Sequence, residues 1–216
     1  MAVKILKAVT ITGDVVASSR LRPLQRKKLQ HRIDRFAQLF TKQYSDLQFQ
    51  QYRGDSLQAV VTKNRMHGLS IALQLQCFLI TEQFHIRLSL GAGEINFEGK
   101  DVITSDGSAF QVSGHLIDDL KKRNELIAVT GRDTAFAAEW WVHTESLNFV
   151  LQRLSSAQAE ALYLHLQNTK QEEIAKALKI SQPSVHQRLR AAGAQVFTSI
   201  IRRFESTVTL LYIFHS

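Results

Sequence analysis

Two aspartates in the first third of the chain, Asp14 and Asp55, each follow a glycine where an alternating apolar run stops or turns. Carboxylate oxygens are the ligands that Mg²⁺ prefers, and this ion brings substrate phosphates with it. Two such ions about 4 Å apart can align an attacking and a leaving oxygen. If the fold brings the two aspartates together, they predict a site for Mg²⁺ or Mn²⁺. The alternative is structural: Asp14 ends a strand, Asp55 belongs to a hairpin turn and Asp106-Gly107 is a loop before a helix.

The pattern around these residues predicts the elements that would position them. Apolar alternation, helical spacing and turn residues predict a strand over 3–12, a helix from Pro23 to about Tyr44, a hairpin around "RGDS", a helix over 66–81 and a strand over 84–95. This order is the split βαβ of ferredoxin-like folds, in which the first strand lies beside the hairpin. A helix over 107–122, a strand "ELIAVT" and a helix over 132–151 extend it. We expect an α+β fold with a palm domain over 1–150.

Residues 151–216 read as continuous helix with short breaks, which predicts a separate all-α domain. Ser155 or Ser156 is expected to cap a helix that runs through Leu166. Thr169, with Glu172 three residues later, is expected to form a capping box for the next helix. Ser181 is expected to cap a third helix, with Pro183 just inside it. The apolar tail after residue 195 is a candidate dimer surface.

The run "QEEIAKALKISQPSVHQRL" resembles the helix-turn-helix of sigma-factor region 4 and of many bacterial regulators. The resemblance implies that the third helix enters the major groove of double-stranded DNA. The residues then expected to face base edges are Gln182, Ser184, His186 and Gln187. Arg188 and Arg190 would contact phosphates or guanines. A helical hairpin used for protein contacts fits the same turn chemistry.

The front half carries "ITGDVVASSR", "YRGDSLQAVV", "IRLSLGAGEI" and "SDGSAFQVSGHL" in an order that resembles the SatD family. The same segments are similar to class III nucleotidyl cyclase and GGDEF palms. The resemblance implies that Asp14 and Asp55 hold a metal. It also implies a nucleotide-binding set: Gly13, Gly54, Asp106, Gly107, Gln111 and His115. Arg20 and Arg22 begin a basic run directly after Asp14, and we expect them to neutralise a triphosphate there; the alternative is a solvated helix face. Gln111 and His115 stand where cyclases place an Asn and an Arg, and Gln51 replaces a purine-reading lysine.

These departures bear on catalysis, because a neutral imidazole cannot replace the fixed charged fork of an arginine at a phosphoryl group. Losing such a group costs on the order of 10³ in rate. The metal pair is therefore expected to persist without the full catalytic set. Whether the chain is an enzyme stays open at this point.

The amino-acid composition limits the partners, the cellular compartment and the kinds of catalytic site that fit this chain. The formal net charge is +8, and residues 151–216 carry 8 Lys/Arg against 4 Asp/Glu, a balance that favours phosphate-bearing partners. The single cysteine, Cys77, forms no internal disulfide, and no signal or membrane-spanning run is seen, so we expect a cytoplasmic protein. The scattered histidines exclude a zinc motif, and no serine-hydrolase or dinucleotide fingerprint is found.

Two functional hypotheses follow, and a third involves neither DNA nor catalysis. The first is a DNA-binding transcriptional regulator, expected to be a homodimer, whose degenerate cyclase-like domain senses a nucleotide or dimerises. The second is a metal-dependent nucleotidyl cyclase or transferase acting on a nucleoside triphosphate. The third is a scaffold in which both parts bind only protein.

Overall fold

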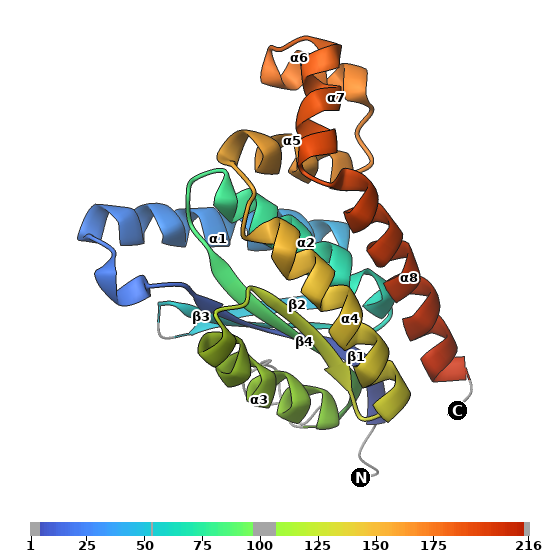
Figure 1. Ribbon diagram of the computed structural model, residues 1–216. Helices are drawn as coiled ribbons and strands as arrows, with labels where there is room; N and C mark the ends of the chain where they lie inside the picture. Colours follow the sequence, from blue (N-terminus) through green and yellow to red (C-terminus); the bar gives the residue numbers. More distant parts are fainter. Residues whose placement is uncertain (1–4, 53, 97–106, 214–216) are drawn as a thin grey trace.

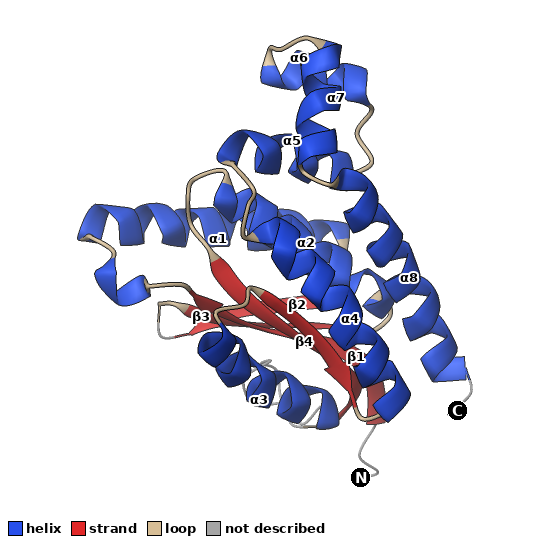
Figure 2. Ribbon diagram, in the orientation of Figure 1, coloured by secondary structure: helices blue, strands red, loops and turns tan. Residues whose placement is uncertain are grey.

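A computed structural model describes residues 5–52, 54–96 and 107–213, and its core is a five-stranded mixed sheet (Figures 1 and 2). The strand order is β2-β3-β1-β4-β5. The strands are β1 (Ile5–Val15), β2 (Leu47–Tyr52), β3 (Ser56–Val61), β4 (Ile86–Asn96) and β5 (Ile127–Gly131). β1 is antiparallel to both β3 and β4, whereas β5 is parallel to β4. The predicted split βαβ order and the α+β class are confirmed.

Helices cover both faces of the sheet (Figure 1). The helices of the first part are α1 (Pro23–Gln43), α2 (Gly68–Ile80), α3 (Ser108–Arg123) and α4 (Thr134–Leu151), with 3₁₀ turns η1 (Ser18–Arg20) and η2 (Arg65–His67). α1, α2 and α4 lie on one face and α3 lies on the other. Alternation along β1 divides its side chains accordingly: Val9 and Ile11 join the large core cluster, and Thr10 faces α3.

α3 lies very close to the sheet because β4 places two glycines, Gly91 and Gly93, beneath it. A Cβ built on Gly91 would lie 2.2 Å from the carbonyl oxygen of Ala109. Buried hydroxyls fill the rest of this contact: Thr10 Oγ1 donates to Ala109 O (2.8 Å), and Ser89 Oγ donates to Ser113 O (2.7 Å). The "LGAG" run of β4 therefore serves the packing of α3.

The C-terminal helices are α5 (Ser156–Leu166), α6 (Gln171–Leu178), α7 (Gln182–Ala191) and α8 (Ala194–Ile213). The caps at Ser155 and Ser181 are confirmed, since each side chain accepts a hydrogen bond from a backbone N–H three residues later. The predicted Thr169 cap is wrong. Thr169 N still donates to Leu164 O (3.3 Å) in the turn that closes α5, and α6 is capped one residue later, at Lys170.

α8 returns from this group to the sheet-bearing part of the chain (Figure 1). Phe204 meets the buried Trp140 of α4 edge-on, with ring centroids 5.0 Å apart. Phe197, Phe204 and Val208 are all buried. Part of the tail that the sequence suggested as a dimer surface therefore packs inside its own chain, because α4 supplies a large aromatic partner, while Val196 and Leu210 stay exposed. The largest cluster of buried residues extends across residue 150, and the domain boundary there stays a prediction.

Candidate functional site

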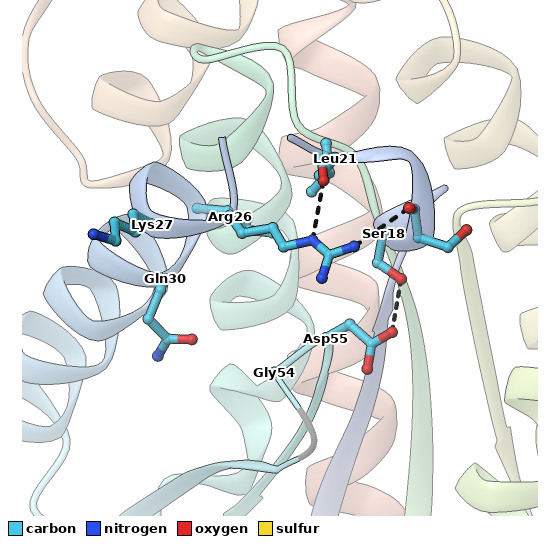
Figure 3. A pocket seen from close by; sticks show the side chains of 9 residues that line it. Ser18, Leu21, Arg26, Lys27, Gln30, Gly54 and Asp55 are labelled. Atoms are coloured by element: carbon cyan, nitrogen blue, oxygen red, sulfur yellow. Dashed lines mark hydrogen bonds between the residues drawn. The ribbon is translucent and has the colours of Figure 1, made fainter. Parts of the chain in front are cut away.

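Asp55 lies in a pocket of about 450 Å³ at one end of the sheet (Figure 3). The β1–α1 loop, the first turns of α1 and the β2–β3 turn form its walls. The lining residues are Ser18, Ser19, Leu21, Arg26, Lys27, Leu29, Gln30, Gly54 and Asp55. Gly54 has a φ of 77°, a left-handed conformation that glycine adopts without strain, and it turns the hairpin so that Asp55 directly precedes β3.

The Asp55 carboxylate is oriented by the loop that follows β1. Ala17 has a φ of 54°, so the chain reverses there and η1 presents Ser18 to the hairpin. Ser18 Oγ donates to Asp55 Oδ2 (2.7 Å), and Val15 N donates to Asp55 O (2.9 Å). The side chain and the backbone of Asp55 are therefore both tied to the end of β1.

Basic and amide side chains of α1 form the opposite wall. Arg26 Nε donates to Leu21 O (3.0 Å) and Arg26 Nη2 to Ser19 O (3.3 Å), and the side chain reaches across to this loop in Figure 3. Gln51 Nε2 donates to Gly54 O (2.8 Å) and Gln51 Oε1 accepts from Gln30 Nε2 (2.7 Å). Gln51, which the resemblance aligned with a base-reading lysine, thus supports the turn in this structure.

Asp14 is adjacent to Asp55 in the backbone, but its carboxylate has other partners. Asp14 pairs with Ser56 in the β1–β3 register, one residue from Asp55. Its oxygens lie 3.8 Å from Arg87 Nη1 and 3.5 Å from Lys121 Nζ. Asp14 shares the strand parity of Thr10, so it meets α3, which supplies the lysine. Among the described residues, no three His, Cys, Asp or Glu side chains form a group that could hold a metal ion.

The residues expected to bind a nucleotide fall in different places. Gly54 lines the pocket, while Arg20 and Arg22 are exposed in the segment that leads into α1 and do not line it. Gly13 is buried, and a Cβ there would meet Leu57 at 2.7 Å. On α3, Gln111 and His115 are exposed, and Gly107 is the N-cap with a φ of 147°. Asp106 lies outside the described residues.

The predicted DNA-reading residues gather on α7. Gln182, His186, Gln187 and Arg190 are exposed, whereas Val185 and Leu189 are buried, as the periodicity predicted. Ser184 and Arg188 are less exposed than expected, because each side chain contacts a neighbouring residue. Ser184 Oγ lies 2.8 Å from Ser181 Oγ at the cap, and Arg188 Nη1 lies 3.7 Å from Glu160 Oε2 of α5.

Comparison with known families extends over nearly the whole chain. The model of the SatD family matches residues 8–210. The chain belongs to the SatD family. The match includes the pocket of Asp55 and the exposed face of α7, so both features lie within the region that the family describes. A comparison with curated proteins found no match.

Several solved structures are similar to this SatD chain at low identity. A bacterial light-regulated adenylyl cyclase is 17% identical with a TM-score of 0.46, over 59% of this chain and 77% of that one. The guanylyl cyclase Cya2 is 12% identical with a TM-score of 0.43, over 55% and 73%. The adenylyl cyclase CyaB from P. aeruginosa is 11% identical with a TM-score of 0.40, over 55% and 74%. The proposals below rest on this chain's own residues and contacts.

The sequence analysis missed two features of this candidate site. It gave no role beside Asp55 to Ser18, although "SS" four residues after Asp14 places hydroxyls in the β1–α1 loop. It also did not pair Asp14 with Arg87 and Lys121. The parity of β1 indicates the face that Asp14 occupies, but only the docking of α3 brings the lysine there. Among the described residues no helix is long and apolar enough to cross a membrane.

Proposed function

We propose that this SatD family chain binds a nucleoside triphosphate, presented with Mg²⁺ or Mn²⁺, in the pocket of Asp55. One observation carries the proposal: a carboxylate and a hydroxyl, held 2.7 Å apart, share a pocket of about 450 Å³ with the basic residues Arg26 and Lys27. Oxygen donors suit a hard divalent cation, and the basic side chains suit the phosphates that accompany it. A pocket of this volume is in the range that small ligands occupy.

The same contacts favour binding without turnover. Two-ion phosphoryl chemistry needs carboxylates that face a common site. Of the carboxylates that the structure describes, only that of Asp55 lines the pocket, and Asp14 is compensated by Arg87 and Lys121. The side chains at the positions of the cyclase Asn and Arg, Gln111 and His115, lie on α3 and do not line this pocket. The oxygen donors present therefore fit a cation that arrives with the ligand, and we derive no catalytic step through it.

Titration calorimetry of the full chain with each nucleoside triphosphate tests this proposal, in Mg²⁺ and in EDTA. We expect binding that depends on the cation and that Asp55→Asn weakens at least tenfold. Asp119→Asn removes an exposed carboxylate from α3 and is the matched control. Binding equal in EDTA, or equal in Asp55→Asn, would contradict the proposal.

Turnover is the competing function, and the adjacency of the Asp14 and Asp55 backbones favours it. Lys121 is 46% exposed, so its contact with Asp14 can open at little cost. Incubation with Mn²⁺ and each triphosphate, followed by chromatography of the products, separates the two functions. A cyclic nucleotide that disappears in both Asp14→Asn and Asp55→Asn would establish catalysis in place of binding alone.

We further propose that α7 contacts double-stranded DNA. The supporting observation is the exposed polar stripe of Gln182, His186, Gln187 and Arg190 at a serine-capped helix. Such a module makes few phosphate contacts, so useful affinity requires two copies on two half-sites.

A gel-shift series with the full chain on random-sequence and genomic fragments tests the DNA proposal. Arg190→Ala is expected to weaken binding and to lower the slope of log K against log salt by about 1. Gln195→Ala, on the exposed side of α8, is the matched control. Phosphate contacts are strong at about 50 mM salt, so the absence of binding there would contradict the DNA proposal. These helices would then serve to bind a protein partner.

A further inference from the structure

The side-chain amide of Gln30, which lines the Asp55 pocket, has an orientation that its partners fix. Its Nε2 donates to Asp34 Oδ1 (3.0 Å) and to Gln51 Oε1 (2.7 Å). Gln51 is itself oriented, because its Nε2 donates to Gly54 O (2.8 Å). Both partners of Gln30 therefore only accept, and a rotated amide would place its oxygen against them. The amide group of Gln30 has no donor left for a ligand.

The Oε1 atom of Gln30 is the group that remains for a ligand. It accepts no hydrogen bond from the part of the chain that the structure describes. In Figure 3 this oxygen lies on the side of the amide that faces Asp55, and the Gln30 side chain is half-buried. A ligand in the pocket can therefore reach it. An acceptor without a donor beside it favours a ligand group that donates, because two facing acceptors would lose their water contacts and gain nothing.

The guanidinium of Arg26, one helical turn before Gln30, is fixed in a complementary way. Its Nε and Nη2 donate to Leu21 O and Ser19 O, which leaves Nη1. Nη1 donates to no residue that the structure describes, and in Figure 3 it lies on the side of the guanidinium that faces Asp55. A guanidinium that two carbonyls already hold loses little freedom when it binds a phosphate oxygen.

We propose, on the basis of the nucleotide-binding function above, that Gln30 selects the base of the bound nucleotide. Its Oε1 accepts a hydrogen bond from an N–H group of the base, while Arg26 Nη1 donates to a phosphate oxygen. Leu21 and Leu29 also line the pocket and offer apolar contact to the face of a base. The ligand class is therefore a nucleoside triphosphate whose base carries a hydrogen-bond donor.

Titration calorimetry of the full chain in Mg²⁺ tests this proposal with three kinds of probe. The first are ATP, GTP, CTP and UTP, whose bases all carry N–H donors. The second is purine riboside triphosphate, whose base has none, and the third is inorganic tripolyphosphate, which has no nucleoside. We expect at least one of the four nucleotides to bind at least tenfold more tightly than purine riboside triphosphate. Binding of all five with equal affinity would overturn the role of Gln30 and leave the nucleotide site standing. No binding of any triphosphate would overturn both.

Two variants assign the contacts to their residues. Gln30→Met keeps the length of the side chain and removes the amide, so it is expected to weaken the best-bound nucleotide at least tenfold. Purine riboside triphosphate and tripolyphosphate should bind this variant within about twofold of the unmodified chain. Arg26→Gln is expected to weaken every probe, tripolyphosphate included. Gln38→Met and Lys42→Gln, at exposed positions of α1, are the matched controls.

The pattern across probes separates a base contact from a structural role of Gln30. If Gln30→Met weakened tripolyphosphate as much as the nucleotides, the amide would only support the hairpin turn through Gln51, and the proposal would fail. If it weakened purine riboside triphosphate as much as ATP, Oε1 would contact the ribose, and the selection of a base would fail. The comparison of probes on the unmodified chain decides alone if Gln30→Met does not fold.

Discussion

Asn148 of α4 carries a prediction whose size follows directly from its contacts. Its Oδ1 accepts from Leu126 N (2.8 Å) and Ile127 N (2.9 Å), and its Nδ2 donates to Ile127 O (2.9 Å). The side chain is only 4% exposed. It therefore fastens α4 to the start of β5, and α4 in turn supports α8 through Trp140 and Phe204.

Asn148→Leu keeps a similar volume and removes all three hydrogen bonds. At a net value of about 1 kcal/mol each, their loss lowers the free energy of unfolding by about 3 kcal/mol. The β5 backbone groups left without these partners add to this, at about 1–3 kcal/mol for any group that water cannot reach. We expect a total loss of about 3–5 kcal/mol, which lowers the melting temperature by roughly 10 °C in a chain of this size.

Urea unfolding of the full chain, followed by circular dichroism, measures this loss. Ser146→Ala, an exposed change on the same helix, is the control and is expected to change the free energy of unfolding by no more than about 0.5 kcal/mol. A loss below about 1 kcal/mol in Asn148→Leu would show that β5 does not depend on this side chain, and the reasoning from buried hydrogen bonds would fail.

Three further predictions concern other positions. Gly91→Ala places a Cβ 2.2 Å from Ala109 O, so it is expected to lower the free energy of unfolding in urea by about 3 kcal/mol. Gly114→Ala has nothing within 4 Å of its Cβ and is expected to raise this free energy by about 0.5–1 kcal/mol. Equal effects of the two substitutions would contradict the close packing of α3. Burial lowers the pKa of His85 and His165, so the stability that their neutral forms provide is complete above the unfolded pKa of about 6.5 and falls as the pH drops below it. Melting temperatures measured from pH 7.5 to 5.5 should show this fall. Changing both histidines to Gln should flatten the plot of melting temperature against pH. Burial raises the pKa of Cys77 to about 12, so a thiol reagent at pH 8 should label it only in denaturant, and rapid labelling of the native chain would show that α2 opens.

Much of the fold follows from local patterns in the sequence. Alternation predicted the strands, helical spacing predicted α1 to α4, and the hydroxyls of Ser155 and Ser181 predicted two helix starts. The missed cap at Lys170 shows the limit of this reasoning. The turn after α5 places Asn168 in a left-handed conformation, and the length of that turn decides which residue begins the next helix.

The sequence likewise predicted one part of the candidate site and could not predict another. The order of the elements alone indicated that Asp14 and Asp55 would lie at one end of the sheet, because an antiparallel first strand must end where the hairpin turns. The sequence could not indicate what their carboxylates would touch. Arg87 is adjacent only through the β1–β4 register, and Lys121 only because two glycines let α3 press against β4.

Local periodicity, turn chemistry and helix capping act over a few residues, so the order of strands and helices could be predicted from the sequence alone. Contacts between distant segments decide the direction of each acidic side chain and the burial of the C-terminal helix against Trp140. Such contacts are selected by the packing of whole elements, where one missing Cβ or one aromatic partner outweighs any local preference.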